Sequence, residues 1–237
     1  MTLASDPTVS VIIPAYNCQR YIAEALESAL HQTYAPLEVI VVDDSSTDQT
    51  LEIARGFAQA RCVSQLHAGA GQARNRGAAL ARGALLAFLD ADDRWPLNKL
   101  SRQVEALRLQ CDLDMVFGCV QQLHAGAEWE EGITKPEGST SLLMPGLIAG
   151  TMLIRREAFD RVGKFKAEWK VGEFIDWYGR AADLGLRSAC LPDLLLWRRI
   201  HTTNQGIVER ASLSDYAKVI KACLDRRRAS ARGGDGS

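Results

Sequence analysis

The chain has 237 residues, of which 47% are hydrophobic, 24% charged and 7% aromatic, as in an ordinary globular protein of one domain. Its 28 Lys and Arg residues nearly balance 29 Asp and Glu residues, so the formal net charge of -1 argues against a nucleic-acid partner. The longest uncharged stretch, residues 138–154, is interrupted by Pro145, Gly146 and Gly150, so we expect no transmembrane segment.

The cysteines and the N-terminal residues indicate a reducing compartment. The six cysteines include no Cys-x-x-Cys pair, and a chain of this size needs no disulfide framework, so reduced thiols are expected. The first apolar run is Val9–Ile13, and polar residues follow it directly, which does not resemble a secretory signal. The sequence therefore predicts a cytoplasmic protein.

Strands and helices alternate in the first half of the chain. Short apolar runs typical of buried strands occupy residues 9–13, 37–42, 62–66 and 84–89. Apolar residues at helical spacing follow each strand, in residues 21–30, 51–57, 70–80 and 97–107. This alternation predicts an α/β fold with a mostly parallel central sheet flanked by helices.

The second half is less regular. Strands are expected at residues 115–120, 151–154 and 194–200, and helices at residues 155–162, 174–184 and 212–227. Residues 121–141 are polar and contain glycine, which predicts a loop or hairpin. Residues 229–237 are predicted to form a disordered tail, because they are rich in Gly, Ser and Arg. The second half is therefore expected to be more mixed.

Acidic residues are sorted by their position relative to the strands. Three polar segments directly follow predicted strands, namely residues 14–17, Asp43 with Asp44, and residues 90–93. The carboxyl ends of parallel strands meet at one edge, where ligands bind in open α/β sheets. Asp112 and Asp114 precede their strand instead, so this second Asp-x-Asp is predicted to be structural.

The Asp-x-Asp of Asp90 and Asp92 predicts a site for a hard divalent cation, which neutralises a diphosphate. The alternative is a solvated turn, but the strand-end position favours the cation site. Gly71 and Arg74 come at the start of a helix, where glycine allows close approach and arginine donates to a ligand. A Rossmann dinucleotide site is disfavoured, because Arg74 stands where its fingerprint needs glycine and no Gly-x-Gly-x-x-Gly follows the first strand.

Four segments together resemble the family 2 glycosyltransferases. They are VSVIIPAYN (9–17), VDDSSTD (42–48), GAGQARNRG (69–77) and FLDADD (88–93), in the family's order and approximate spacing. The resemblance implies a GT-A fold, a nucleotide-diphosphate sugar as donor, with a UDP sugar favoured, and inversion at the anomeric carbon. It also implies a divalent metal, Mn²⁺ or Mg²⁺, at the Asp-x-Asp.

By the same resemblance, the nucleotide sugar contacts Pro14, Ala15, Tyr16, Asn17, Asp44, Gly71, Arg74, Asp90, Ala91 and Asp92. Asp44 corresponds to the acid that binds the base, Asp90 to the acid on the ribose side, and Asp92 to the metal ligand. His201 resembles a late histidine that approaches the metal, and imidazole suits manganese. One domain is expected over residues 1–228, with a nucleotide-binding half to about residue 120 and an acceptor-binding half from about 121.

The sequence departs from the family at the catalytic base. The family commonly has Glu-Asp at the acceptor site, with the Asp as base, whereas this chain has Glu173 followed by Phe174. Asp176 lies three residues after Glu173, so the two acids are expected to share a helix face. Asp176 is therefore predicted to be the general base and Glu173 its backup. The alternative for Asp176 is stabilisation of a helix N-terminus.

These residues predict a metal-dependent inverting glycosyltransferase acting on an acceptor hydroxyl. The acceptor class stays open among a saccharide, a lipid-linked molecule and a small molecule, and so does peripheral association with the inner face of the membrane. One alternative is a module that binds the donor without transfer, because Phe174 replaces the usual base. A second is a nucleotidyltransferase, although its Gly-rich loop is absent from residues 14–17.

Overall fold

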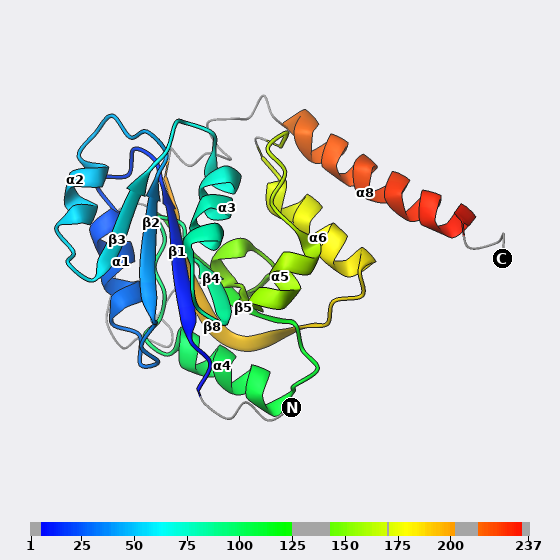
Figure 1. The fold of residues 1–237 in the computed structure, drawn as a ribbon, viewed down its shortest axis with the longest axis horizontal. Helices are drawn as coiled ribbons and strands as arrows, with labels where there is room; N and C mark the ends of the chain where they lie inside the picture. Colours follow the sequence, from blue (N-terminus) through cyan, green and yellow to red (C-terminus); the bar gives the residue numbers. More distant parts are fainter. Residues whose placement is uncertain (1–5, 125–142, 170, 202–212, 234–237) are drawn as a thin grey trace.

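The computed structural model describes residues 6–124, 143–169, 171–201 and 213–233. Within these ranges, eight strands form one sheet that is flanked by helices on both faces (Figure 1). The α/β fold and the parallel central strands predicted from the sequence are confirmed. In the part of the chain that the structure describes, no helix is long and apolar enough to cross a membrane.

The first half builds a parallel sheet in the order β3-β2-β1-β4. Its strands are β1 (Val9–Ala15), β2 (Glu38–Asp43), β3 (Ala60–Ser64) and β4 (Leu85–Phe88). Its helices are α1 (Ile22–Leu30), α2 (Thr50–Arg55), α3 (Ala70–Leu80) and α4 (Lys99–Leu109). Because these strands are parallel, the loops after β1, β2 and β4 leave the sheet at the same edge.

The second half adds a mixed extension to this sheet. Its strands are β5 (Met115–His124), β6 (Met144–Gly146), β7 (Leu153–Arg155) and β8 (Ser188–Ile200). Strand β7 is antiparallel to β4 and β5, and β8 runs parallel to β5. The helical elements are the 3₁₀ turn η1 (Ala149–Thr151), α5 (Arg156–Val162), α6 (Glu173–Asp183) and α8 (Leu213–Gly233).

The structure corrects three predicted boundaries. Residue 151, expected to begin a strand, belongs to the η1 turn, and the strand begins at residue 153. Residues 121–124 extend β5, and the remainder of the predicted loop, 125–141, lies outside the described residues. Residues 229–233, predicted to be disordered, continue α8, while residues 234–237 are not described. The helix continues because Ala and Arg are good helix formers.

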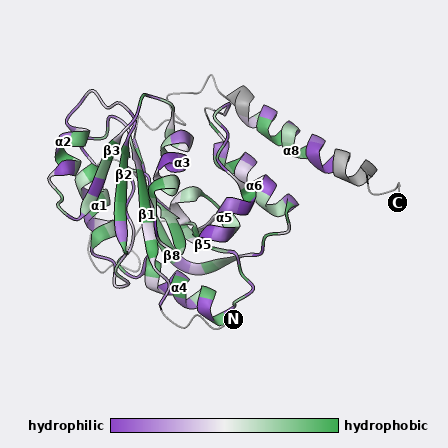
Figure 2. Ribbon diagram, viewed as in Figure 1, coloured by the Kyte–Doolittle hydropathy of each residue, from purple (hydrophilic) through white to green (hydrophobic). Residues whose placement is uncertain are grey.

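The core forms one layer on each face of the sheet. Alternate residues of β1 point to opposite faces, so Val11 and Ile13 pack with α1 and α4, whereas Ile12 packs with α5 and α6. Both layers contain fully buried side chains, among them Trp95 and Trp177. Figure 2 shows the hydrophobic residues concentrated on the central strands, where they are shielded by helices. The sheet therefore gives a rigid base for the loops at its carboxyl edge.

Three buried side chains hold the η1 turn through consecutive backbone carbonyls of residues 150–152. Trp95 Nε1 donates to the first carbonyl at 2.8 Å, Gln103 Nε2 to the second at 2.7 Å, and Lys99 Nζ to the third at 3.4 Å. Lys99 is fully buried, and its Nζ lies 3.8 Å from the centre of the Trp95 ring. Burial lowers the pKa of Lys99 well below its usual value.

The buried Lys99 should make stability depend on pH. Between its folded-state pKa and its unfolded value of about 10.4, the unfolded chain binds more protons, so stability rises with pH. The melting temperature of the wild type minus that of Lys99→Met should therefore increase as the pH rises toward about 10. The exposed Lys221 serves as control, because Lys221→Met should give a difference that is flat with pH. A flat Lys99→Met difference would contradict the prediction.

Candidate active site

The loops after β1 and β2 are tied to each other at the carboxyl edge of the sheet. Asn17 adopts a positive φ of 49°, which asparagine tolerates better than most residues. Its side-chain Oδ1 accepts from the backbone N–H of Thr47 at 2.8 Å, and its own N–H donates to Ser46 Oγ at 3.0 Å. The Asp44 N–H donates to the carbonyl of Ala15 at 2.8 Å. These bonds hold the loops after β1 and β2 in fixed positions relative to each other.

Asp44 is a buried acid with four hydrogen-bond donors around it. Its carboxylate accepts from the backbone N–H groups of Ala68 and Gly69 at 2.9 and 2.8 Å, and from Gln65 Nε2 at 2.7 Å. His67 Nδ1 lies 3.0 Å from the same carboxylate. The acid that the sequence assigned to the nucleobase thus also holds the N-terminus of α3 in place.

Tyr16 presents an open aromatic surface beside Asp44. Tyr16 is 48% exposed, and the centre of its ring lies 4.4 Å from that of His67. Exposed aromatic rings next to a hydrogen-bonding acid are suited to a nucleobase, which has a flat face and polar edges. The sequence patterns did not single out His67, because its position beside Tyr16 is set by the packing of two loops.

The remaining residues assigned to the donor differ in accessibility. Asn17 is exposed, whereas Pro14, Ala15 and Ala91 are buried and shape the loops through their backbone. A Cβ on Gly71 would lie 3.1 Å from Glu173 Cγ, so glycine there allows α6 to approach α3 closely.

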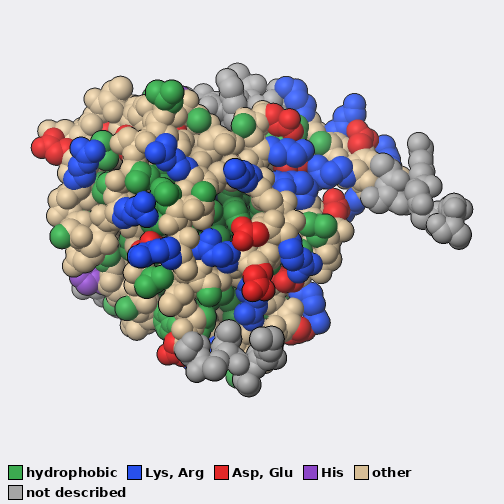
Figure 3. Space-filling view, viewed as in Figure 1, with side chains coloured by type: hydrophobic (Ala, Val, Ile, Leu, Met, Phe, Trp, Pro, Cys, Tyr) green, Lys and Arg blue, Asp and Glu red, His purple; other side chains and the backbone are tan. Residues whose placement is uncertain are grey.

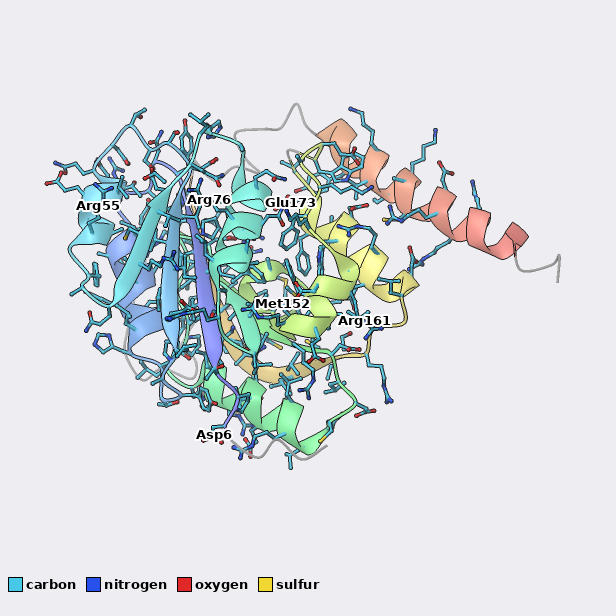
Figure 4. All side chains as sticks on the ribbon, viewed as in Figure 1. Asp6, Arg55, Arg76, Met152, Arg161 and Glu173 are labelled. Carbon is cyan, nitrogen blue, oxygen red and sulfur yellow. The ribbon has the colours of Figure 1, made fainter. Side chains whose placement is uncertain are left out.

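Arg74 joins the two halves of the protein. Its Nη2 donates to Asp90 Oδ1 at 2.5 Å, and its Nη1 donates to Glu173 Oε1 at 2.6 Å. Burial by itself lowers the pKa of the Arg74 guanidinium, but Asp90 and Glu173 raise it more, so the group stays charged. Figure 4 shows Glu173 at the N-terminus of α6, facing α3. An acid of the second half is thereby held next to the acids that follow β4.

Asp92 and His201 meet at the same edge. His201 Nε2 lies 3.0 Å from Asp92 Oδ2, although the residues are 109 positions apart. Arg199 anchors this loop, since its backbone N–H donates to Asp93 Oδ1 at 2.9 Å and its Nε to the carbonyl of Asp92 at 3.2 Å. Burial, followed by repulsion from Asp92 and Asp90, raises the pKa of Asp93 well above its usual value.

The pair of Asp92 and His201 fits a divalent metal that is shared with a ligand. Neighbouring ligands of an octahedral ion, each about 2.1 Å from it, lie about 3 Å apart, and the two side chains have this separation. Among the described residues, no three His, Cys, Asp or Glu side chains gather as a metal site. Diphosphate oxygens and water could complete the ligands of such an ion, as is usual for Mg²⁺.

Asp176 does not present its carboxylate to this site, and its assignment as the base stays a prediction that this geometry does not favour. Its side chain is fully buried, with Oδ2 accepting from Arg180 Nε at 3.0 Å and Oδ1 from Arg226 Nη1 at 2.8 Å. Figure 3 shows Lys and Arg side chains gathered where α8 meets α6. Phe174 is also turned away, into the core against Phe117. Of the two acids proposed as base, only Glu173 is next to Arg74 and Asp90.

This arrangement predicts that Asp176 matters for stability. Asp176→Asn should cost roughly 2–3 kcal/mol, less than for a fully buried pair, because Arg180 and Arg226 reach solvent. For a chain of this size, this cost corresponds to a fall of about 5–10 °C in melting temperature. Asp183→Asn, which removes a more exposed partner of Arg226, should cost under about 1 kcal/mol. Equal melting temperatures of both variants would refute the structural role.

The fold and the gathered residues define a class of transferase built on the GT-A fold. A family model described as glycosyl transferase family 2 matches residues 10–163. This match covers more than half of the chain, and the chain belongs to glycosyl transferase family 2. Glu173 and His201 lie beyond the matched residues.

Several proteins similar to this chain are named glycosyltransferases. Over 105 residues, the chain is 43% identical to the UDP-Glc:alpha-D-GlcNAc-diphosphoundecaprenol beta-1,3-glucosyltransferase WfaP of Escherichia coli, covering 43% of this chain and 42% of the relative. Over 185 residues it is 33% identical to an uncharacterised glycosyltransferase of Rickettsia prowazekii, covering 73% and 58%. The chain thus spans about half the length of these relatives.

Solved structures of S. aureus TarS share the fold. The complex of TarS 1-349 with UDP-GlcNAc superimposes with a TM-score of 0.71 at 24% sequence identity, covering 91% of this chain and 65% of that chain. The complex of TarS 1-349 with UDP gives a TM-score of 0.65 at 25% identity, covering 82% and 61%. The predicted GT-A fold is confirmed by this similarity.

Proposed function

We propose that the protein transfers a sugar from a nucleotide diphosphate, with UDP as the favoured nucleotide, to an acceptor hydroxyl with inversion at the anomeric carbon. The observation that carries the proposal is the bridge of Arg74 between Asp90 and Glu173. An acid suited to activate an acceptor is thereby held beside the acids suited to bind a donor.

The donor side uses the loops after β1, β2 and β4. In the proposal, the nucleobase stacks on Tyr16 and donates to Asp44, and the ribose hydroxyls donate to Asp90. The exposed Tyr16 ring beside Asp44 supports the first contact. The complexes of TarS with UDP and UDP-GlcNAc support a uridine nucleotide on this fold.

Asp92 and His201 would hold a divalent cation, Mn²⁺ or Mg²⁺, against the diphosphate. When bound, the cation supplies positive charge that stabilises the leaving diphosphate. Asp92 contributes a carboxylate oxygen and His201 the lone pair of Nε2, which favours manganese over magnesium. The separation of the two atoms, 3.0 Å, supports this assignment.

Glu173 acts as the general base in place of the usual aspartate. It takes the proton of the acceptor hydroxyl while that oxygen bonds to the anomeric carbon and the bond to the diphosphate breaks. Attack from the face opposite the diphosphate inverts the configuration. Arg74 holds Oε1 of Glu173 at 2.6 Å, and we assign the other carboxylate oxygen, Oε2, to the proton.

For the acceptor, the names of the relatives favour a lipid-linked molecule. The matching E. coli enzymes WfaP and WfgD are named for an undecaprenol diphosphate acceptor. A lipid-linked acceptor would bring the protein to the inner face of a membrane as a peripheral protein. Saccharide and small-molecule acceptors are the other outcomes of an acceptor screen.

A donor-binding module without transfer is the second candidate function. The observation that favours it is Phe174, which lies in the core at the position of the usual base. Wild-type protein that neither hydrolyses a labelled UDP sugar nor transfers it to a broad acceptor panel would establish this alternative. The family match favours the glycosyltransferase and the donor-binding module over the nucleotidyltransferase that the sequence also allowed.

The metal assignment predicts a specific loss in Asp92→Asn. Mn²⁺ with a UDP sugar should raise the wild-type melting temperature more than the UDP sugar alone, because ligands of the folded state stabilise it. Asp92→Asn should remove most of this metal-dependent part. The matched control is Asp112→Asn, from the Asp-x-Asp that precedes β5 and pairs with Arg187, and it should respond like the wild type. An unchanged response in Asp92→Asn would overturn the assignment.

The base assignment predicts a loss of rate without a loss of donor binding. Glu173→Gln keeps an oxygen for Arg74 but removes the base, so transfer should fall by roughly 10² to 10⁴-fold. Calorimetry should find UDP-sugar affinity nearly unchanged, and the acid limb of the pH–rate profile should disappear. Glu168→Gln, at an exposed acid near the same helix, is the control and should keep full activity. Wild-type turnover in Glu173→Gln would exclude Glu173 as the base.

A further inference from the structure

His201 directly follows the last residue of β8. Its Nε2 lies 3.0 Å from Asp92 Oδ2, in the pair proposed to hold the cation. A metal ligand must keep its ring in one orientation, which partners outside the coordination shell usually provide. The structure shows such a partner in Tyr21, which the sequence analysis did not assign to the site.

Tyr21 lies directly before α1, and its backbone is well anchored. Its N–H donates to the carbonyl of Cys18 at 2.9 Å, and its carbonyl accepts from Ala25 at 3.1 Å. The helix behind it is fixed in the core by the fully buried Ile22 and Leu26. The Tyr21 ring therefore projects from a rigid support.

Two side chains from the end of β8 pack on this ring. The centres of the Tyr21 and His201 rings lie 4.9 Å apart, with 30° between their planes. The Arg199 guanidinium lies 4.5 Å from the centre of the Tyr21 ring. Residues two apart in an extended chain project to the same side, which explains why Arg199 and His201 both reach Tyr21.

Arg199 connects this packing to the Asp-x-Asp loop. It donates to the carbonyl of Asp92 and, through its backbone, to Asp93. Its positive charge is offset by Glu24 of α1, whose Oε2 accepts from Nη2 at 2.7 Å. The start of α1, the Asp-x-Asp loop and the end of β8 are thus joined around one aromatic ring.

We infer that Tyr21 is a positioning residue, whose ring holds the His201 imidazole in the orientation that lets Nε2 share a divalent cation with Asp92. The inference rests on the proposed metal centre. Tyr21 itself supplies no metal ligand in this arrangement, because its ring, rather than its hydroxyl, makes the contacts with His201 and Arg199.

The test compares UDP binding with Mn²⁺ and with EDTA by titration calorimetry, in which the ratio of the two affinities measures the metal-dependent gain. Tyr21→Leu should lower this gain by about 10-fold to 100-fold, the usual effect of losing an outer partner of a metal ligand. Tyr21→Phe keeps the ring and should stay within about twofold of the wild type. Tyr34→Leu, at a tyrosine that bonds to Pro7, controls for loss of an aromatic side chain elsewhere.

A spectroscopic measurement separates positioning from a general loss of stability. Electron spin-echo modulation of bound Mn²⁺ detects a directly ligated imidazole nitrogen, which should be present in the wild type and Tyr21→Phe and weakened in Tyr21→Leu. If Tyr21→Leu does not fold, Tyr21→Met replaces it, because the flexible Met side chain fills the space of a lost ring.

Three results would overturn the inference. In the first, Tyr21→Leu keeps the wild-type ratio of UDP affinities with Mn²⁺ and with EDTA, whereas Asp92→Asn loses it. This result would remove the role of Tyr21 and leave the metal centre intact. Another is an equal loss of UDP affinity with Mn²⁺ and with EDTA, which makes Tyr21 a nucleotide contact. The third is a full gain in Asp92→Asn, which removes the metal centre and the role of Tyr21 together.

Discussion

The buried charge of Arg74 is the interaction on which the site depends. A guanidinium that is 5% exposed is stable only with anionic partners, and its two partners come from different halves of the chain. The need to pair this charge therefore holds the N-terminus of α6 against α3. Gly71 eases the approach, since a Cβ there would lie only 3.1 Å from Glu173 Cγ.

The helical period of α6 separates the roles of its first residues. Glu173 faces Arg74, whereas Phe174 and Trp177 enter the core and Asp176 turns toward Arg180 and Arg226. Gly172, with a φ of 79°, lets the chain turn into the helix while packing against α8. The packing of α6 against α3, the core and α8 thus determines that Glu173 is the acid beside the donor loops.

The loops at the carboxyl edge of the sheet are held by contacts with η1, α1 and β8 as well as by contacts with each other. Trp95, directly after the Asp-x-Asp loop, bonds to the η1 turn, and Arg199 ties the same loop to α1 and β8. Contacts of this kind fix backbone positions before a ligand arrives, so less conformational entropy is lost on binding. Thr151 and Met152, at the end of the η1 turn, are both fully buried. They support the site rather than line it.

The sequence by itself determined the α/β order, the parallel first half and the edge at which Asp44, Asp90 and Asp92 emerge, because strand ends and loop residues are local features. It also supplied both acids proposed as the base, but ranked Asp176 first. Only the tertiary structure shows that Glu173 meets Arg74 while Asp176 meets Arg180 and Arg226, because i, i+3 spacing does not state which neighbour each residue meets. The burial of Lys99, the four donors around Asp44 and the packing of His201 on Tyr21 likewise depend on segments far apart in the chain. The local sequence pattern determines the strand, helix or loop in which a residue lies, and the packing of distant elements determines which residues its side chain contacts.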